Sequence, residues 1–203
     1  MAKQELKIQI PAPNIKIMKI KITGTSPLIF HKWDEKAIKM MLDKQMKKAS
    51  KGREVRDPER EYKESFYYDA EGKIAFPARN IKQAIVGSAR FIQGVPMTIL
   101  RGSIFVKGDK DGFIPVQFKE QRMRQDMVTV GMGSADIRFR GELEDWSMEF
   151  IIEFDADLLS AEQVLNLLQR AGFSQGLGEW RPEKNGDNGC FVVESTSENA
   201  LDK

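Results

Sequence analysis

The chain contains a single histidine, His31, which is the residue with the most direct chemical potential. An imidazole titrates near neutral pH and can serve as a general acid or base, as in metal-independent cleavage of RNA. Such a role needs a charged or hydroxyl-bearing partner, for which Lys32, Tyr67 and Tyr68 are the candidates. A histidine that packs, or lies on the surface after a strand, is the more common case, so the sequence favours a structural His31 over a catalytic one.

The sequence contains few residues that could bind a metal or a cofactor. One cysteine, Cys190, and one histidine are too few for a structural zinc site, and a lone cysteine cannot form an intramolecular disulfide. Asp155 and Asp157 follow a predicted strand, and this placement is more typical of a strand end and a helix cap than of a metal pair. We therefore predict no metal and no cofactor, and an enzymatic role is the less favoured one.

A glycine-rich segment near the end of the chain contains Gly176 and Gly178. Nucleotide-binding folds and P-loops place their glycines between a strand and a following helix, whereas these glycines lie between a helix and a strand, so both are rejected. Glycine permits positive φ and close approach of another backbone. Two readings stay open: a loop that a nucleic-acid backbone can approach, or a helix end and hairpin without a ligand.

Basic side chains are gathered in several segments, although the formal net charge is only +2. Phosphates are bound mainly by charge and need little fixed geometry, so basic arms suit a single-stranded nucleic acid. Tyr67, Tyr68, Phe76 and Phe139 could stack on bases. The alternative is that the charges are solvated and the rings belong to the core. The basic candidates are Lys47, Lys48, Arg53 and Arg56 in a first loop, Arg138 and Arg140 in a second, Arg79 and Lys82 on a helix, and Arg181 in the glycine-rich segment.

Hydrophobic periodicity and helix-start signals divide the chain into strands and helices. Apolar and basic residues alternate over 15–22, which is typical of a half-buried strand. Helices are expected where a cap or a proline precedes an amphipathic stretch, as at Asp57 and Pro58. The predicted strands cover 15–22, 66–68, 73–76, 102–106, 113–118, 146–154 and 190–193, and the predicted helices begin at Asp34, Asp57, Pro77 and Ser160.

Three segments are expected to lack regular structure. Residues 44–57 are crowded with Lys and Arg and predict a mobile basic insertion. Residues 121–140 are rich in Arg, Met and Gly and predict an irregular arm, and residues 195–203 predict a disordered tail. Gly172 is expected to stop the last helix.

The order of these elements is a strand, helices, strands, and then strand–helix–strand. That order predicts an α+β fold of the ferredoxin-like, modified RRM-like kind, an antiparallel sheet with helices on one face plus irregular insertions. We expect one domain over 1–194. Because no apolar run matches a signal peptide or reaches the ~20 residues of a membrane-spanning helix, we expect a cytoplasmic protein.

Three motifs follow one another along the chain: G-T-S-P-L-I-F-H at 24–31, F-P-A-R-N-I-K-Q-A-I-V-G-S-A-R at 76–90 and G-L-G-E-W-R-P at 176–182. In this order they resemble the RAMP superfamily. The likeness is to the RNA-binding backbone subunits of CRISPR effector complexes and to related proteins of bacteriophages and prophages. The resemblance implies that basic loops and the helix after the P-A-R motif hold the RNA backbone, and that subunits polymerise along the strand. It points to Arg79, Asn80, Lys82, Gly176, Gly178 and Arg181.

The favoured function is a non-catalytic protein that binds single-stranded RNA or DNA and forms homo-oligomers along it. One alternative is a metal-independent RNA endonuclease that uses His31, since some relatives cleave RNA with a histidine after the first strand. Another is a protein-interaction or inhibitor module that mimics a CRISPR subunit.

Overall fold

The computed structural model describes residues 11–33, 35–48, 55–130 and 133–199. Its central sheet contains β1 (Ile15–Gly24), β5 (Ile104–Lys107), β9 (Ser147–Asp155) and β10 (Phe191–Asn199). They lie in the order β10–β1–β9–β5, and every neighbouring pair is antiparallel. Helix α3 (Ala78–Ser88) lies between β1 and β5 in the chain, and α5 (Ala161–Ser174) between β9 and β10. This arrangement is the ferredoxin-like βαββαβ fold, as predicted.

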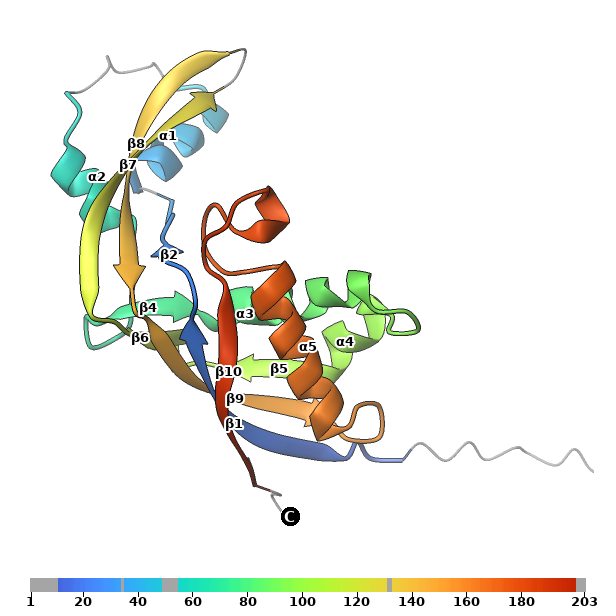
Figure 1. The fold of residues 1–203 in the computed structure, drawn as a ribbon. Coiled ribbons are helices and arrows are strands. Elements are labelled where there is room, and N and C mark those ends of the chain that lie inside the picture. Colours follow the sequence, from blue (N-terminus) through green and yellow to red (C-terminus); the bar gives the residue numbers. More distant parts are fainter. Residues whose placement is uncertain (1–10, 34, 49–54, 131–132, 200–203) are drawn as a thin grey trace, which may run out of the picture.

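The helices α3 and α5 pack together on one side of this sheet (Figure 1). On that side, alternate residues of the strands, such as Ile20 and Ile152, are fully buried against Ile85 of α3 and Leu168 of α5 in a single core. The alternation that is visible in the sequence therefore reports which face of each strand is buried.

The strand residues of the opposite parity carry charges that are largely paired with one another. Because a cation that already has a carboxylate partner attracts a phosphate less strongly, this face offers little free positive charge. The pairs are Lys19 with Glu149 at 3.3 Å, Lys21 with Glu194 at 2.9 Å, and Lys107 with Glu153 at 2.7 Å.

The sheet is extended beside β5 by a short run of strands. β6 (Phe113–Gln117) pairs with the start of β9, β4 (Ile74–Pro77) pairs with β6, and β3 (Tyr67–Tyr68) pairs with β4. The predicted hairpin of β3 and β4 is confirmed. Since β4 leads directly into α3, these strands fix the position at which α3 begins.

Residues 120–130 and 134–144 form the two strands of a long hairpin, and the prediction of an irregular arm over 121–140 is therefore wrong. β7 (Glu120–Val130) pairs with β8 (Ser134–Glu144) along its whole length, and β2 (Leu28–Ile29) joins β8. Figure 1 shows this hairpin, in yellow and gold, extending away from the central sheet. Its sequence lacks an apolar alternation because ion pairs, such as Arg140 with Asp126, occupy positions where strands usually bury apolar side chains.

The remaining helices agree with the predictions in part. Asp57 caps α2 (Pro58–Glu64) by accepting a hydrogen bond from the Arg60 amide at 3.1 Å. The cap predicted at Asp34 lies outside the described residues, and the helix that follows, α1, covers Glu35–Gln45. Helix α4 (Met97–Ser103) was not predicted, because 102–106 was assigned to a strand that in fact begins at Ile104.

Two predicted ends of elements are wrong. Gly172 does not stop α5, which continues to Ser174; instead a Cβ at Gly172 would lie 2.1 Å from the carbonyl oxygen of Phe191, so this glycine lets β10 approach the helix. The tail expected to be disordered from 195 is strand up to Asn199, paired with β1. None of the helices in the described ranges has both the length and the hydrophobicity needed to cross a bilayer.

Candidate nucleic-acid interface

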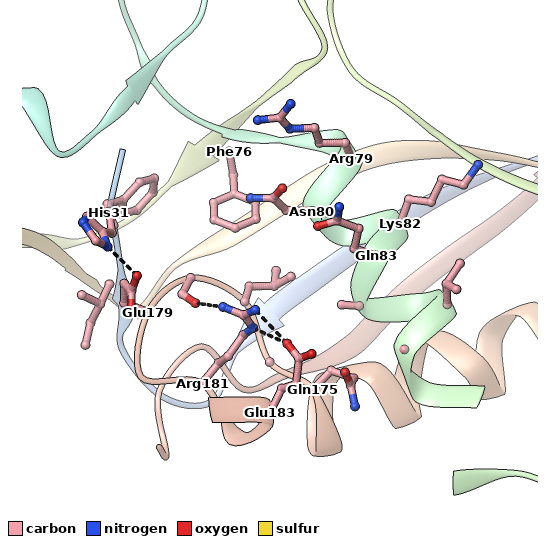
Figure 2. A pocket seen from close by; sticks show the side chains of 18 of the residues that line it. His31, Phe76, Arg79, Asn80, Lys82, Gln83, Gln175, Glu179, Arg181 and Glu183 are labelled. Carbon is pink, nitrogen blue, oxygen red and sulfur yellow. Dashed lines mark hydrogen bonds and ion pairs between the residues drawn. The ribbon is translucent and has the colours of Figure 1, made fainter. Parts of the chain in front are cut away.

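A cavity of about 590 Å³ lies between α3 and the glycine-rich loop that follows α5 (Figure 2). Its volume is within the range of pockets that hold ligands. Most of its wall comes from three parts of the chain: residues 29–31 with His31, helix α3 from Arg79 to Gly87, and the loop residues 175–183. Further residues of the wall are Tyr67, Phe76, Arg90, Met97 and Arg101. The three motifs that carry the sequence resemblance are therefore brought together around one space.

Helix α3 presents two rows of polar side chains beside this cavity. Residues three apart lie on the same side of a helix, so Arg79 and Lys82 form one row and Asn80 and Gln83 another. In Figure 2, Asn80 and Gln83 extend toward the centre of the cavity, and Arg79 and Lys82 extend away from Arg181. The helix thus separates its cations from its amides.

The cationic row carries positive charge that is available to a ligand. Among the residues that the structure describes, Arg79 is exposed and forms no hydrogen bond or ion pair. The Lys82 ammonium donates to the carbonyl oxygen of Arg101 at 2.8 Å and lies 3.8 Å from the ring centroid of Phe105. Burial lowers the pKa of Lys82. No carboxylate is paired with either cation in the described part of the chain, so the pair can attract an anion.

The same two cations line a second cavity, of about 540 Å³, on the other side of the α3 start. The end of β5 supplies Lys107 to its wall, and the turn between β5 and β6 supplies Asp109, Lys110 and Asp111. The two cavities also share Tyr67, whose pKa is raised by burial, with a smaller opposing effect from the Arg79 charge. A polar track therefore runs from the glycine-rich loop, across the start of α3, to the β5–β6 turn.

The glycine-rich loop is shaped by its own backbone. Gly176 and Gly178 have φ values of +66° and +74°. A Cβ at Gly178 would lie 2.3 Å from the carbonyl oxygen of Ile29, so β2 of the protein itself occupies the space that the glycine leaves. The positive φ values and this contact account for the glycines through the shape of the loop itself, and the close approach of a nucleic-acid backbone stays a prediction.

Arg181 is held within the loop by two partners. Its guanidinium donates to the carbonyl oxygen of Gly178 at 2.7 Å and to the Glu183 carboxylate at 2.7 and 3.0 Å. The charge of Arg181 is thereby largely neutralised. This side of the cavity also carries Glu179 and is less favourable for a phosphate than the α3 side.

His31 has a carboxylate partner that the sequence did not indicate. Its Nδ1 lies 2.5 Å from Oε1 of Glu179 (Figure 2). A carboxylate can only accept, so Nδ1 donates and Nε2 is left for other contacts. The hydrogen bond from His31 outweighs burial and holds the pKa of Glu179 below its ordinary value. Of the partners predicted for His31, Tyr67 lines the same cavity.

The other predicted basic residues lie apart from this cavity and are mostly paired. Arg56 donates to Glu61 and to Asp136, whose carboxylate also pairs with Arg138. Arg140 is only 6% exposed and pairs with Asp126. The last group comprises Lys47, exposed after α1; Lys48, paired with Asp43 at 3.1 Å; and Arg53, which lies outside the described residues.

Several polar residues of the cavity wall were missed from the sequence: Gln83, Arg101, Gln175, Glu179 and Glu183. Gln83 could have been found, because it lies one helical turn after Asn80 on the predicted helix. Glu179 was inside the quoted glycine motif but was not singled out. Its partner is 148 residues away, a separation over which sequence spacing says nothing about contact.

Comparison with known proteins gives similarity of fold only. No family model matches the chain, and no curated protein matches it. The chain is similar to a chain in the cryo-EM structure of the type III-B Cmr-beta bound to cognate target RNA, with a TM-score of 0.59 at 9% identity. The match covers 92% of this chain but 61% of that one. A crystal structure of Cmr6 from Pyrococcus furiosus matches at 13% identity with a TM-score of 0.42, over 89% of this chain and 99% of that one.

Proposed function

We propose that the protein binds a single-stranded nucleic acid across the start of α3, with phosphates on the side of Arg79 and Lys82, and that it does not cleave the strand. The observation that carries the proposal is the position of these two cations, which lack carboxylate partners within the described residues and lie where two cavities meet. A single strand needs such an extended polar track.

The distribution of charge elsewhere supports this choice of surface. The cations of the open sheet face and of the hairpin are paired with carboxylates, so they compete less well for phosphates. The fold similarity to a chain of an RNA-bound complex makes RNA the first ligand to test. DNA of the same sequence serves as the comparison.

The test is the salt dependence of binding to a fluorescent single-stranded RNA, measured by anisotropy. We expect affinity to fall steeply with salt, with a log–log slope of about −0.7 for each phosphate neutralised. Replacing Arg79 with Ala should weaken binding and make the slope shallower by about one such contact. The matched control is Lys19→Ala, which removes the same charge from the open sheet face.

Two results would overturn the proposal. One is the absence of binding to single strands of either kind at low salt. The other is an Arg79→Ala variant that binds like the Lys19→Ala control with an unchanged slope.

We further propose that copies of the protein assemble along the strand. The observation that supports assembly is a set of exposed apolar side chains on α1 and on the hairpin, of the kind that marks interaction surfaces. They include Met40 at 63%, Leu42 at 51%, Met127 at 77% and Ile137 at 40% exposure.

A second candidate function, RNA cleavage, is favoured by the contact between His31 and Glu179. A histidine whose Nδ1 donates to a carboxylate has the orientation of a general base, with Nε2 available to a hydroxyl. Incubation with single-stranded RNA in the presence of a chelator tests it: cleavage that is lost in His31→Ala but retained in Lys32→Ala would establish the activity. Intact RNA after prolonged incubation with the wild type would exclude it.

A further inference from the structure

We propose that the cavity between α3 and the glycine-rich loop takes one unstacked base of the bound strand, and that Asn80 and Gln83 read its edge, with adenine preferred. This inference rests on the proposed function and adds sequence preference to a site whose other contacts are to phosphates.

The side-chain amides of Asn80 and Gln83 are positioned to contact a base in the cavity. Asn80 and Gln83 lie on the α3 row that extends into the cavity (Figure 2). Within the described part of the chain, neither amide forms a side-chain hydrogen bond. By contrast, Lys82 donates to the carbonyl oxygen of Arg101, and Glu179 accepts from His31. A primary amide presents a donor beside an acceptor, which matches the N6 amino group beside N7 on the Hoogsteen edge of adenine; guanine has two acceptors there, and pyrimidines have no ring nitrogen on that edge. Recognition of single strands commonly uses such splayed bases.

Most of the cations and the carboxylates that line the cavity lie on different sides of it: Arg79, Lys82, Arg90 and Arg101 line it from α3, the turn after α3 and α4, and the carboxylates line it from the loop. The loop wall carries Glu179 and Glu183, and the Glu183 carboxylate already neutralises Arg181. A phosphate placed against the loop wall would be repelled by these carboxylates, whereas an uncharged base would not be repelled. The unpaired cation Arg79 lies on the neighbouring row of α3 and extends away from Arg181. A strand whose backbone follows Arg79 and Lys82 would therefore turn its bases toward Asn80 and Gln83.

The far wall of the cavity is polar as well. Gln175, only 3% exposed, lies against α3 because the helix has a glycine there: a Cβ at Gly87 would be 2.5 Å from Gln175 Oε1. Gly87 is one turn after Gln83 on the same row. The buried Gln175 amide thus backs α3 at Gly87, while Phe76 and Met97 add apolar surface to the cavity wall.

The experiment compares four single-stranded RNAs, an oligouridylate and the same strand carrying one central adenine, cytosine or guanine. For the wild type we expect about tenfold tighter binding to the adenine-containing strand. An Asn80→Ala, Gln83→Ala double variant should bind all four strands alike and keep the wild-type salt slope. Arg79→Ala should keep the adenine preference, but its affinity should depend less steeply on salt concentration than that of the wild type. A Gln83→Glu variant, which keeps the side-chain size but removes the donor, should reduce the preference.

The outcomes separate this inference from the proposed function. Base reading is overturned if the wild type binds all four strands with equal affinity, or if the double amide variant keeps the adenine preference. Either result leaves the proposed phosphate binding intact. Failure of every strand to bind at low salt overturns the proposed function itself. Thermal melting of each variant, followed by circular dichroism, establishes that loss of preference is not loss of fold.

Discussion

Gly178 is the residue on which the shape of the cavity depends most directly. It has φ of +74°, and a Cβ there would lie 2.3 Å from the carbonyl oxygen of Ile29. Gly94 has φ of +79° with open space around it and is the matched control. We expect Gly94→Ala to cost about 1 kcal/mol of unfolding free energy, from backbone strain alone, and Gly178→Ala to cost clearly more. Urea unfolding of both variants measures the difference, and equal costs would show that the close approach to β2 is not rigid.

Glu179 makes the folded state sensitive to acid. Its pKa is held below the ordinary value of 4.5, chiefly by the hydrogen bond from His31. A depressed carboxylate pKa contributes stability that is present above the unfolded-state pKa and lost as pH falls through the folded-state pKa. We therefore expect the unfolding free energy to fall less between about pH 6 and about pH 3 in Glu179→Gln than in the wild type. Urea unfolding at several pH values measures it.

His31→Ala provides the complementary variant for this prediction. Since it removes the hydrogen-bond donor and leaves the carboxylate, it should also reduce the acid sensitivity that Glu179 confers. A wild-type pH dependence in both variants would show that the pair has no role in stability.

At the scale of elements, the hairpin of β7 and β8 is held by a charged cluster centred on Glu142, whose side chain is 3% exposed. Burial raises its pKa, but hydrogen bonds from Arg124 and Arg122 outweigh this and keep the pKa low. We expect Glu142→Gln to reduce the unfolding free energy by about 1–3 kcal/mol, because the buried side chain loses its charge-assisted hydrogen bonds from Arg122 and Arg124. Glu144→Gln, which removes a more exposed partner of Arg122, should cost less than about 1 kcal/mol.

Hydrogen exchange locates the effect of this substitution. Amides of β7 and β8 should lose protection in Glu142→Gln while those of β1 and β9, which belong to the central sheet, keep theirs. Uniform loss across both sheets would mean that the hairpin and the ferredoxin-like core unfold as one unit.

At the scale of the whole molecule, binding and assembly are expected to be coupled. Light scattering coupled to size exclusion should give particles whose mass grows with the length of a single-stranded RNA. The double variant Leu42→Ser, Met127→Ser, which removes two exposed apolar side chains, should bind a short strand normally but form smaller particles on long ones. A mass that corresponds to one copy on every length of strand would contradict assembly.

The sequence by itself determined the central fold, because its signals are local. Alternation of apolar residues identified β1 and β9, and caps or prolines with amphipathic spacing identified α2, α3 and α5. The order of these elements was enough to predict the ferredoxin-like arrangement. The helical row that contains Asn80 could also be read from the sequence, since the three-residue spacing is a property of the helix itself.

Only the tertiary structure decided the site and the hairpin. The hairpin is stabilised by pairs such as Arg140 with Asp126 across two strands, and charges carry no apolar periodicity from which a strand is predicted. The contact of His31 with Glu179 depends on which distant segments pack together. The same is true of the ion pairs that occupy most of the predicted cations and leave Arg79 without a carboxylate partner in the described residues. Packing of the glycine-rich loop against β2 brings these segments together, and no spacing along the chain specifies it.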